Sequence, residues 1–100
     1  MAKLSYASQA LQDIESLTSF LAESDPAVAL ETAQLIEEAV LILGRHPLIG
    51  RPIEHGLREL IISRGRTGYV ALYLYRENED VALILAIRHQ REAGYWRAQF

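Results

Sequence analysis

The 100-residue sequence predicts an α+β fold in which an antiparallel helical hairpin packs on an antiparallel meander sheet, in the order β-α-α-β-β-β. Two observations predict it. Apolar residues recur at helical spacing through the first half of the chain, and they form short strand-like runs through the second half. With 50% hydrophobic and 23% charged residues, a chain of this length can form one compact domain but not two, so residues 1–100 are expected to be a single domain.

The hairpin is predicted from two apolar stripes separated by a stop-and-start signal. Ser8 is expected to cap a first helix over about residues 9–23. Asp25 and Pro26 suit the start of a second helix, and Gly44 is expected to end it. Helices joined so tightly must pack antiparallel. The inward stripe of the second helix is expected to carry Ala29, Ala33, Ile36, Val40 and Leu43.

Four segments are predicted to be strands. Alternating polar and apolar residues at 3–6 indicate a short first strand. Two prolines and two glycines make 45–56 a loop, since neither residue suits a continuous helix or a central strand. Strands are then expected at about 57–64, 69–76 and 81–88. Because the turns between these three are short, they must form a meander.

The middle strand of the meander is apolar on both faces. A strand covered on one side alone should alternate, so something other than the hairpin must cover the second face. One candidate is the C-terminal segment, expected to be a short helix or tail with Tyr95, Trp96 and Phe100. The other candidate is a second protein.

Charge is distributed unevenly along the chain. Residues 1–43 hold Lys3 against seven acidic residues, whereas 44–100 hold nine arginines against six acidic residues. This asymmetry suggests two faces with different partners, although both could simply be solvated surface. The chain has no cysteine and no apolar run long enough to span a membrane, so we expect a cytoplasmic protein with no membrane partner.

Four stretches give the chain a specific resemblance, at residues 46–52, 57–60, 73–76 and 87–92. In this order and spacing they resemble the RelE/ParE family of toxins from type II toxin–antitoxin systems. The resemblance implies a toxin neutralised by a cognate antitoxin, with which it could form a hetero-oligomer. It also implies one of two targets: DNA gyrase for the non-catalytic ParE branch, or ribosome-bound mRNA for the nuclease RelE branch.

The charge balance and one position favour the ParE branch. Metal-independent RNA cleavage needs side chains that move protons and stabilise the phosphate, and ribosome binding favours a basic surface. This chain is acidic, with a net charge of −3 and a single lysine. RelE-type nucleases commonly carry an arginine after the tyrosine that begins the middle strand, where this chain has Val70 after Tyr69. A third interpretation is a non-catalytic member that only binds its antitoxin and represses transcription with it.

Candidate site residues follow from these alternatives. A nuclease would need several side chains to converge at one end of the sheet, and the candidates are Arg58, Arg66, His89, Arg91 and Tyr95. His89 would then be an acid or base and Arg91 a phosphate clamp; alternatively, His89 packs at the sheet end and Arg91 pairs with Glu92.

For a gyrase-binding toxin, the expected target contacts are Arg88, Arg91 and Arg97. The expected antitoxin contacts are Leu35, Ile42, Tyr73 and Tyr75. The three histidines lack the spacing of zinc ligands, so neither a metal nor a cofactor is expected.

Overall fold

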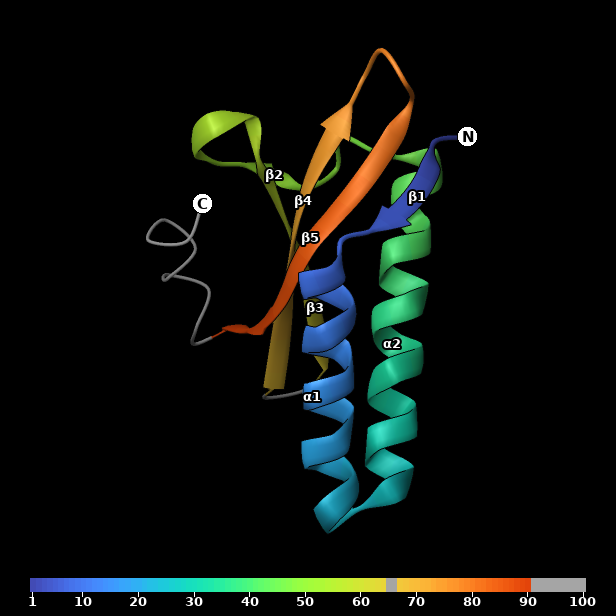
Figure 1. Cartoon of the computed structure of the whole chain (residues 1–100), viewed down its shortest axis with the longest axis vertical. Coiled ribbons are helices and arrows are strands. Elements are labelled where there is room, and N and C mark those ends of the chain that lie inside the picture. Colours follow the sequence, from blue (N-terminus) through green and yellow to red (C-terminus); the bar gives the residue numbers. More distant parts are fainter. Residues whose placement is uncertain (65–66, 91–100) are drawn as a thin grey trace.

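The computed structural model describes residues 1–64 and 67–90, and it has two layers: a five-stranded sheet and a helical hairpin on one of its faces (Figure 1). The predicted α+β fold and element order are confirmed. The elements are β1 (Lys3–Tyr6), α1 (Ser8–Ser24), α2 (Pro26–Arg45), β2 (Arg51–Pro52), the 3-10 turn η1 (Glu54–Gly56), β3 (Arg58–Arg64), β4 (Thr67–Arg76) and β5 (Val81–His89).

The turn between the helices forms as predicted, but the start of α1 does not. The Asp25 carboxylate accepts hydrogen bonds from the amides of Ala27 at 3.0 Å and Val28 at 3.5 Å, so Asp25 caps α2. The predicted Ser8 cap is wrong: Ser8 is the first residue of α1, and the cap position is Ala7, which has no side-chain hydrogen bond to offer.

The predicted end of α2 at Gly44 is one residue short. Gly44 is buried inside the helix, which continues to Arg45 and is capped by His46. The carbonyl of Gly44 accepts the amide of Ala2 at 2.7 Å, so this glycine ties the helix to the start of β1. Gly44 therefore lies within the helix and does not form a left-handed helix end.

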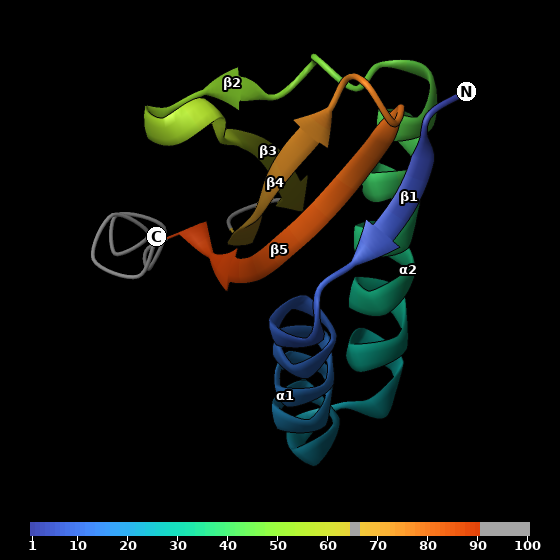
Figure 2. The same cartoon turned by 45° about the horizontal axis from the view of Figure 1, so that its top comes forward.

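The sheet has the strand order β1-β5-β4-β3-β2 (Figure 2). β3, β4 and β5 form the predicted antiparallel meander. β1 pairs parallel with β5, from Lys3 opposite Val81 to Tyr6 opposite Ile84. The two-residue β2 lies at the far edge, where Pro52 costs no hydrogen bond to a neighbouring strand.

The main core lies between the hairpin and the sheet. Ile36, Val40 and Leu43 of α2 meet the helix-facing side chains of β4 and β5, and α1 lies against β5. This layer buries Tyr73, Ala71 and Ile84 completely among others, which confirms the inward stripe expected for α2 from Ile36 to Leu43.

A second, smaller core lies on the opposite face of the sheet. Val70, Leu72 and Ala86 are buried there beneath Ile53 and Leu57, which precede β3. The middle strand is therefore covered on both faces, as its composition requires. We expected the cover to come from the C-terminal segment or a partner, but the loop before β3 supplies part of it; Tyr95, Trp96 and Phe100 lie outside the described residues.

Candidate functional site

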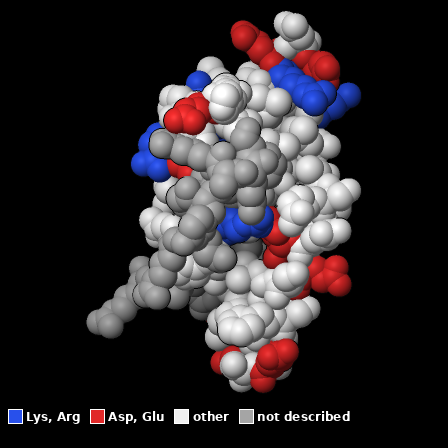
Figure 3. All heavy atoms as spheres, turned by 60° about the vertical axis from the view of Figure 1, so that its left-hand side comes forward, with Lys and Arg blue, Asp and Glu red and all other residues white. Residues whose placement is uncertain are grey.

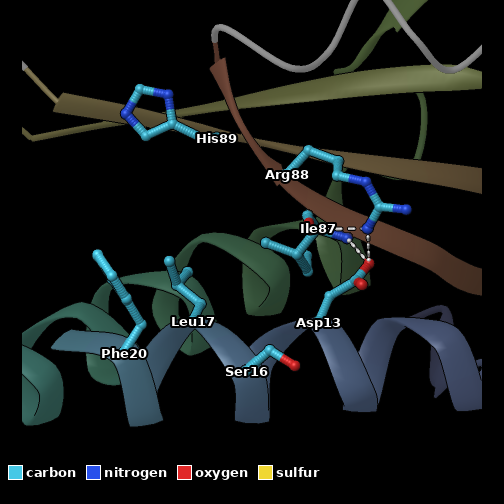
Figure 4. Close-up of a pocket in the computed structure, with 7 residues that line it drawn as sticks. All are labelled: Asp13, Ser16, Leu17, Phe20, Ile87, Arg88 and His89. Carbon is cyan, nitrogen blue, oxygen red and sulfur yellow. Dashed lines mark hydrogen bonds and ion pairs between the residues drawn. The ribbon is translucent and has the colours of Figure 1, made fainter. Parts of the chain in front are cut away.

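The end of β5 and helix α1 border an open hollow of about 340 Å³ (Figure 4). It is lined by Asp13, Ser16, Leu17, Phe20, Ile87, Arg88 and His89. Arg88 and His89 were both predicted as site residues, so their surroundings decide what this part of the sheet can do.

Arg88 forms an ion pair with Asp13 at this end of the sheet. The carboxylate of Asp13 also accepts the amide of Ile87 at 2.9 Å and the side-chain amide of Gln9 at 2.8 Å. The side chains of Asp13 and Arg88 are 10% and 19% exposed. Arg88 therefore links the end of β5 to α1 beside the hollow, and any target contact of the kind predicted for it would have to form with its side chain already held in this mostly buried pair.

His89 packs at the end of the sheet against Tyr69. The two rings lie edge to face with centroids 5.7 Å apart and planes at 81°. Tyr69 is buried and His89 is half-buried. This is the packing that the sequence offered as the alternative to acid or base chemistry.

Arg58 lies at the opposite end of the sheet. Its guanidinium donates to the carbonyls of Leu48 at 3.0 Å and Gly50 at 2.8 Å. Arg58 is opposite Tyr73 in β4, whereas His89 is opposite Tyr69. Four residues along a strand correspond to on the order of 13 Å. Arg58 and His89 therefore do not converge, which corrects the predicted cluster; its remaining members, Arg66, Arg91 and Tyr95, lie outside the described residues, as does Arg97.

Tyr73 is a core residue, which corrects its prediction as an antitoxin contact. Its side chain is completely buried, and its hydroxyl donates to the carbonyl of Pro47 at 2.8 Å. The same hydroxyl accepts the amide of Gly50 at 2.9 Å. Burial raises the pKa of the Tyr73 hydroxyl, which the positive charge of Arg58 and the bond from Gly50 partly oppose.

The other three predicted antitoxin contacts differ in exposure. Ile42 is 46% exposed on α2, whereas Leu35 and Tyr75 are half-buried against the main core. The hydroxyl of Tyr75 donates to the carboxylate of Asp80 at 2.7 Å. That bond holds the proton on the hydroxyl and so raises the pKa of Tyr75. Ile42 thus has the largest exposed fraction among these three.

The loop after α2 carries apolar surface that the sequence analysis did not single out. Leu48 and Ile49 are 59% and 56% exposed. Together with His46 and Pro47 they line a shallow hollow of about 440 Å³. The loop lies within the 46–52 stretch that carries the family resemblance, but its exposure depends on contacts with Arg58 and Tyr73 that the local sequence does not reveal.

Charged side chains are unevenly distributed over the surface. On the face drawn in Figure 3, carboxylates and no lysines or arginines lie at the lower end, where Figure 1 places the turn between the helices. Higher on this face, basic and acidic side chains lie together. Near the sheet edge, Arg51 contacts the buried carboxylate of Glu59 at 2.5 Å.

Within residues 1–64 and 67–90, no three His, Asp or Glu side chains are arranged to hold a metal ion. No helix in the described part of the chain is long and apolar enough to cross a membrane.

Comparisons with known proteins identify the family. The family model described as "ParE toxin of type II toxin-antitoxin system, parDE" matches residues 4–94. The chain is 33% identical over 84 residues to Toxin RelE3 of Caulobacter vibrioides, an alignment that covers 84% of this chain and 89% of that protein.

Solved structures share the fold. A chain of the chromosomal ParDE TA system from P. aeruginosa has a TM-score of 0.73 and 26% identity, covering 89% of this chain and 96% of that one. A chain of the intact E. coli RelBE toxin-antitoxin complex has a TM-score of 0.63 and 13% identity, covering 88% and 95%. With the match of the family model over most of its length, the chain belongs to the ParE toxin family of type II toxin–antitoxin systems.

Proposed function

We propose that this toxin acts in the cytoplasm by binding DNA gyrase and inhibiting it without chemistry of its own, and that a cognate antitoxin silences it. One observation carries the proposal: the described residues that could cleave RNA are held in structural contacts far from one another. Arg58 holds the loop after α2, and His89 packs on Tyr69 at the other end of β4. A nuclease needs such groups within hydrogen-bond reach of one phosphate.

Position 70 supports the same proposal. Val70 is 1% exposed and packs with Leu72 and Ala86 in the smaller core. An arginine at this position, as in RelE-type nucleases, would need a charged group in that apolar layer or a different course for its side chain. The apolar neighbourhood of Val70 supports a toxin without RNA-cleaving chemistry.

The second candidate is a ribosome-dependent mRNA endonuclease. The relative that favours it is Toxin RelE3, which is 33% identical to this chain. Whichever target the toxin has, the protein proposed to silence it is an antitoxin, because the structural neighbours come from a ParDE system and a RelBE complex.

The test measures both targets with one preparation of purified toxin. Relaxed plasmid is supercoiled by purified gyrase in the presence of increasing toxin, and mRNA is followed on translating ribosomes at the same concentrations. We expect loss of supercoiling, restored by stoichiometric antitoxin, and intact mRNA. Ribosome-dependent cleavage with normal supercoiling would replace the proposal with the second candidate.

A further inference from the structure

The loop at residues 46–50 is held to the sheet by four hydrogen bonds. The hydroxyl of Tyr73 bonds the carbonyl of Pro47 and the amide of Gly50, and the guanidinium of Arg58 bonds the carbonyls of Leu48 and Gly50. Tyr73 and Arg58 are cross-strand partners at one level of the sheet. A buried tyrosine and an arginine are therefore devoted to fixing the backbone of one short surface loop.

The fixed backbone presents apolar side chains to the outside. Leu48 and Ile49 are each more than half exposed beside a hollow of about 440 Å³. Two large apolar residues on an ordered loop form a surface that favours burial against another molecule. Because the loop is already ordered, a partner that docks there loses little conformational entropy in fixing it.

The charge around the loop indicates the chemistry of that partner. The segment 45–59 holds three arginines against Glu54 and Glu59. Arg51 pairs with Glu59 and Arg58 bonds the carbonyls of the loop, so the excess of positive charge beside the loop comes from Arg45. Arg45, at the end of α2, is exposed immediately before the loop. A partner segment that places carboxylates beside apolar side chains would be complementary to this surface.

We propose that the 46–49 loop docks an apolar, carboxylate-bearing segment of the cognate antitoxin. This inference rests on the antitoxin named in the proposed function, and it assigns that partner to a surface separate from the hollow between α1 and β5. An ordered apolar surface suits a partner that stays bound, because Leu48 and Ile49 would otherwise remain exposed to water.

The experiment measures binding of the full-length chain to the antitoxin encoded beside the toxin gene, by calorimetry. Leu48→Asp puts a charge into the apolar surface and repels carboxylates. Leu30→Asp is the matched control, because Leu30 is 62% exposed on the same helix–loop unit and lies roughly 22 Å along α2 from Arg45. We expect Leu48→Asp to weaken binding by about ten- to a hundredfold and Leu30→Asp by less than about threefold.

The charge of Arg45 and the hydrogen exchange of the loop amides give two further measurements. Arg45→Gln should weaken binding and flatten its dependence on salt, because a cation that faces carboxylates is lost. Hydrogen exchange of the wild-type chain should slow at residues 48 and 49 when antitoxin is added. This measurement needs no variant, so it tests the surface even if Leu48→Asp fails to fold.

Three results would overturn the inference. The first is unchanged hydrogen exchange at residues 48 and 49 in the complex. The second is equal antitoxin binding by Leu48→Asp and Leu30→Asp. The third is wild-type antitoxin affinity in Leu48→Asp combined with lost gyrase inhibition, which would assign the loop to the target. Failure of the proposed function gives a different pattern. A wild-type toxin that leaves gyrase active, but whose antitoxin binding still depends on Leu48, would sink the gyrase proposal and leave the docking surface standing.

Discussion

The hydroxyl of Tyr73 lies 2.9 Å from the backbone nitrogen of Gly50, so the ring of one residue occupies the space that a side chain at the other would need. A Cβ at position 50 would lie 2.5 Å from Cε1 of Tyr73 and 2.9 Å from the carbonyl oxygen of Glu59. The glycine of the 46–52 stretch is therefore required by close approach to the sheet.

Gly50→Ala is expected to lower the free energy of unfolding by about 1–3 kcal/mol, because the added methyl group must displace a buried ring and a strand. The control is Gly44→Ala, whose Cβ would have its nearest neighbours at 3.5 and 3.6 Å. Since Gly44 lies inside α2, alanine there should raise stability by about 0.5–1 kcal/mol. Urea unfolding of both variants measures the difference, and shifts of the same sign would mean that the loop is not held as described.

Tyr73→Phe is expected to cost about 1–3 kcal/mol, because it leaves the amide of Gly50 and the carbonyl of Pro47 without their buried partner. Tyr75→Phe is the matched control, since the partner of Tyr75 is the exposed carboxylate of Asp80 and water can replace it. Thermal unfolding should separate the two variants clearly. Equal melting temperatures would show that the Tyr73 hydroxyl contributes no more than a surface bond.

The same tyrosine predicts a dependence on alkaline pH. Burial raises the pKa of Tyr73 above its ordinary value of 10.0, so the folded state favours the protonated hydroxyl. Its contribution to stability is complete below the unfolded pKa and is lost as pH rises through the higher folded pKa. The unfolding free energy of wild type should therefore fall above about pH 10, and it should fall less steeply in Tyr73→Phe.

Asp13→Ala is expected to destabilise the fold by about 3 kcal/mol, because it removes the carboxylate that Arg88 and the amide of Ile87 share in a mostly buried place. Glu79→Ala breaks the exposed Arg76–Glu79 pair and should change stability by less than about 0.5 kcal/mol. Chemical unfolding of the two variants compares a buried pair with a surface pair. A small loss of stability in Asp13→Ala would mean that the fold does not depend on the ion pair and that Arg88 is available for surface contacts.

The sequence predicted the local elements well because their signals are local. Asp25 and Pro26 predict a helix start independently of the rest of the chain. The apolar composition of the middle strand predicts that both of its faces are covered. Asp13 and Ile87, by contrast, are 74 residues apart, and nothing near either residue indicates the other. The parallel pairing of β1 with β5 is similarly a long-range choice.

The same distinction explains which site predictions changed. The predictions for Arg88 and Tyr73 rest on residue type and position in a strand, whereas the structure shows that both face inward to partners from distant segments. Tyrosine and arginine combine apolar surface with a polar end, so composition alone does not distinguish a surface contact from a buried anchor. Leu48 and Ile49 give no signal in the sequence, because isolated apolar residues in a loop are common.

Ile36→Ala and Leu72→Ala test the two cores separately. Ile36 is 1% exposed in the main core and Leu72 is 0% exposed in the smaller one. Each truncation should cost about 2–5 kcal/mol and so reduce toxicity through unfolding. Leu30→Ala, at a site 62% exposed, should stay within about 0.5 kcal/mol of wild type. A near-neutral Leu72→Ala would mean that Ile53 and Leu57 cover the second face too loosely to form a core.

His89→Gln distinguishes a binding toxin from a nuclease. Glutamine keeps hydrogen-bonding capacity but cannot take up and release a proton as histidine does at neutral pH. If His89 packs on Tyr69 and does no chemistry, the variant should lose about 0.5–1.5 kcal/mol of stability, the value of an aromatic pair, and keep its inhibition of gyrase at full occupancy. If His89 transfers protons in RNA cleavage, the rate should fall by about 10²–10⁴.

The measurement compares wild type and His89→Gln at a temperature where circular dichroism shows both to be folded, so that lost packing is not mistaken for lost chemistry. Tyr69→Leu serves as the control, because it removes the same ring contact and leaves the imidazole in place. Under the binding mechanism both variants should still inhibit gyrase supercoiling, and Tyr69→Leu should be the less stable because Tyr69 is buried in the main core. If His89→Gln alone abolished ribosome-dependent cleavage while Tyr69→Leu kept it, the imidazole would be a proton carrier and this toxin a nuclease.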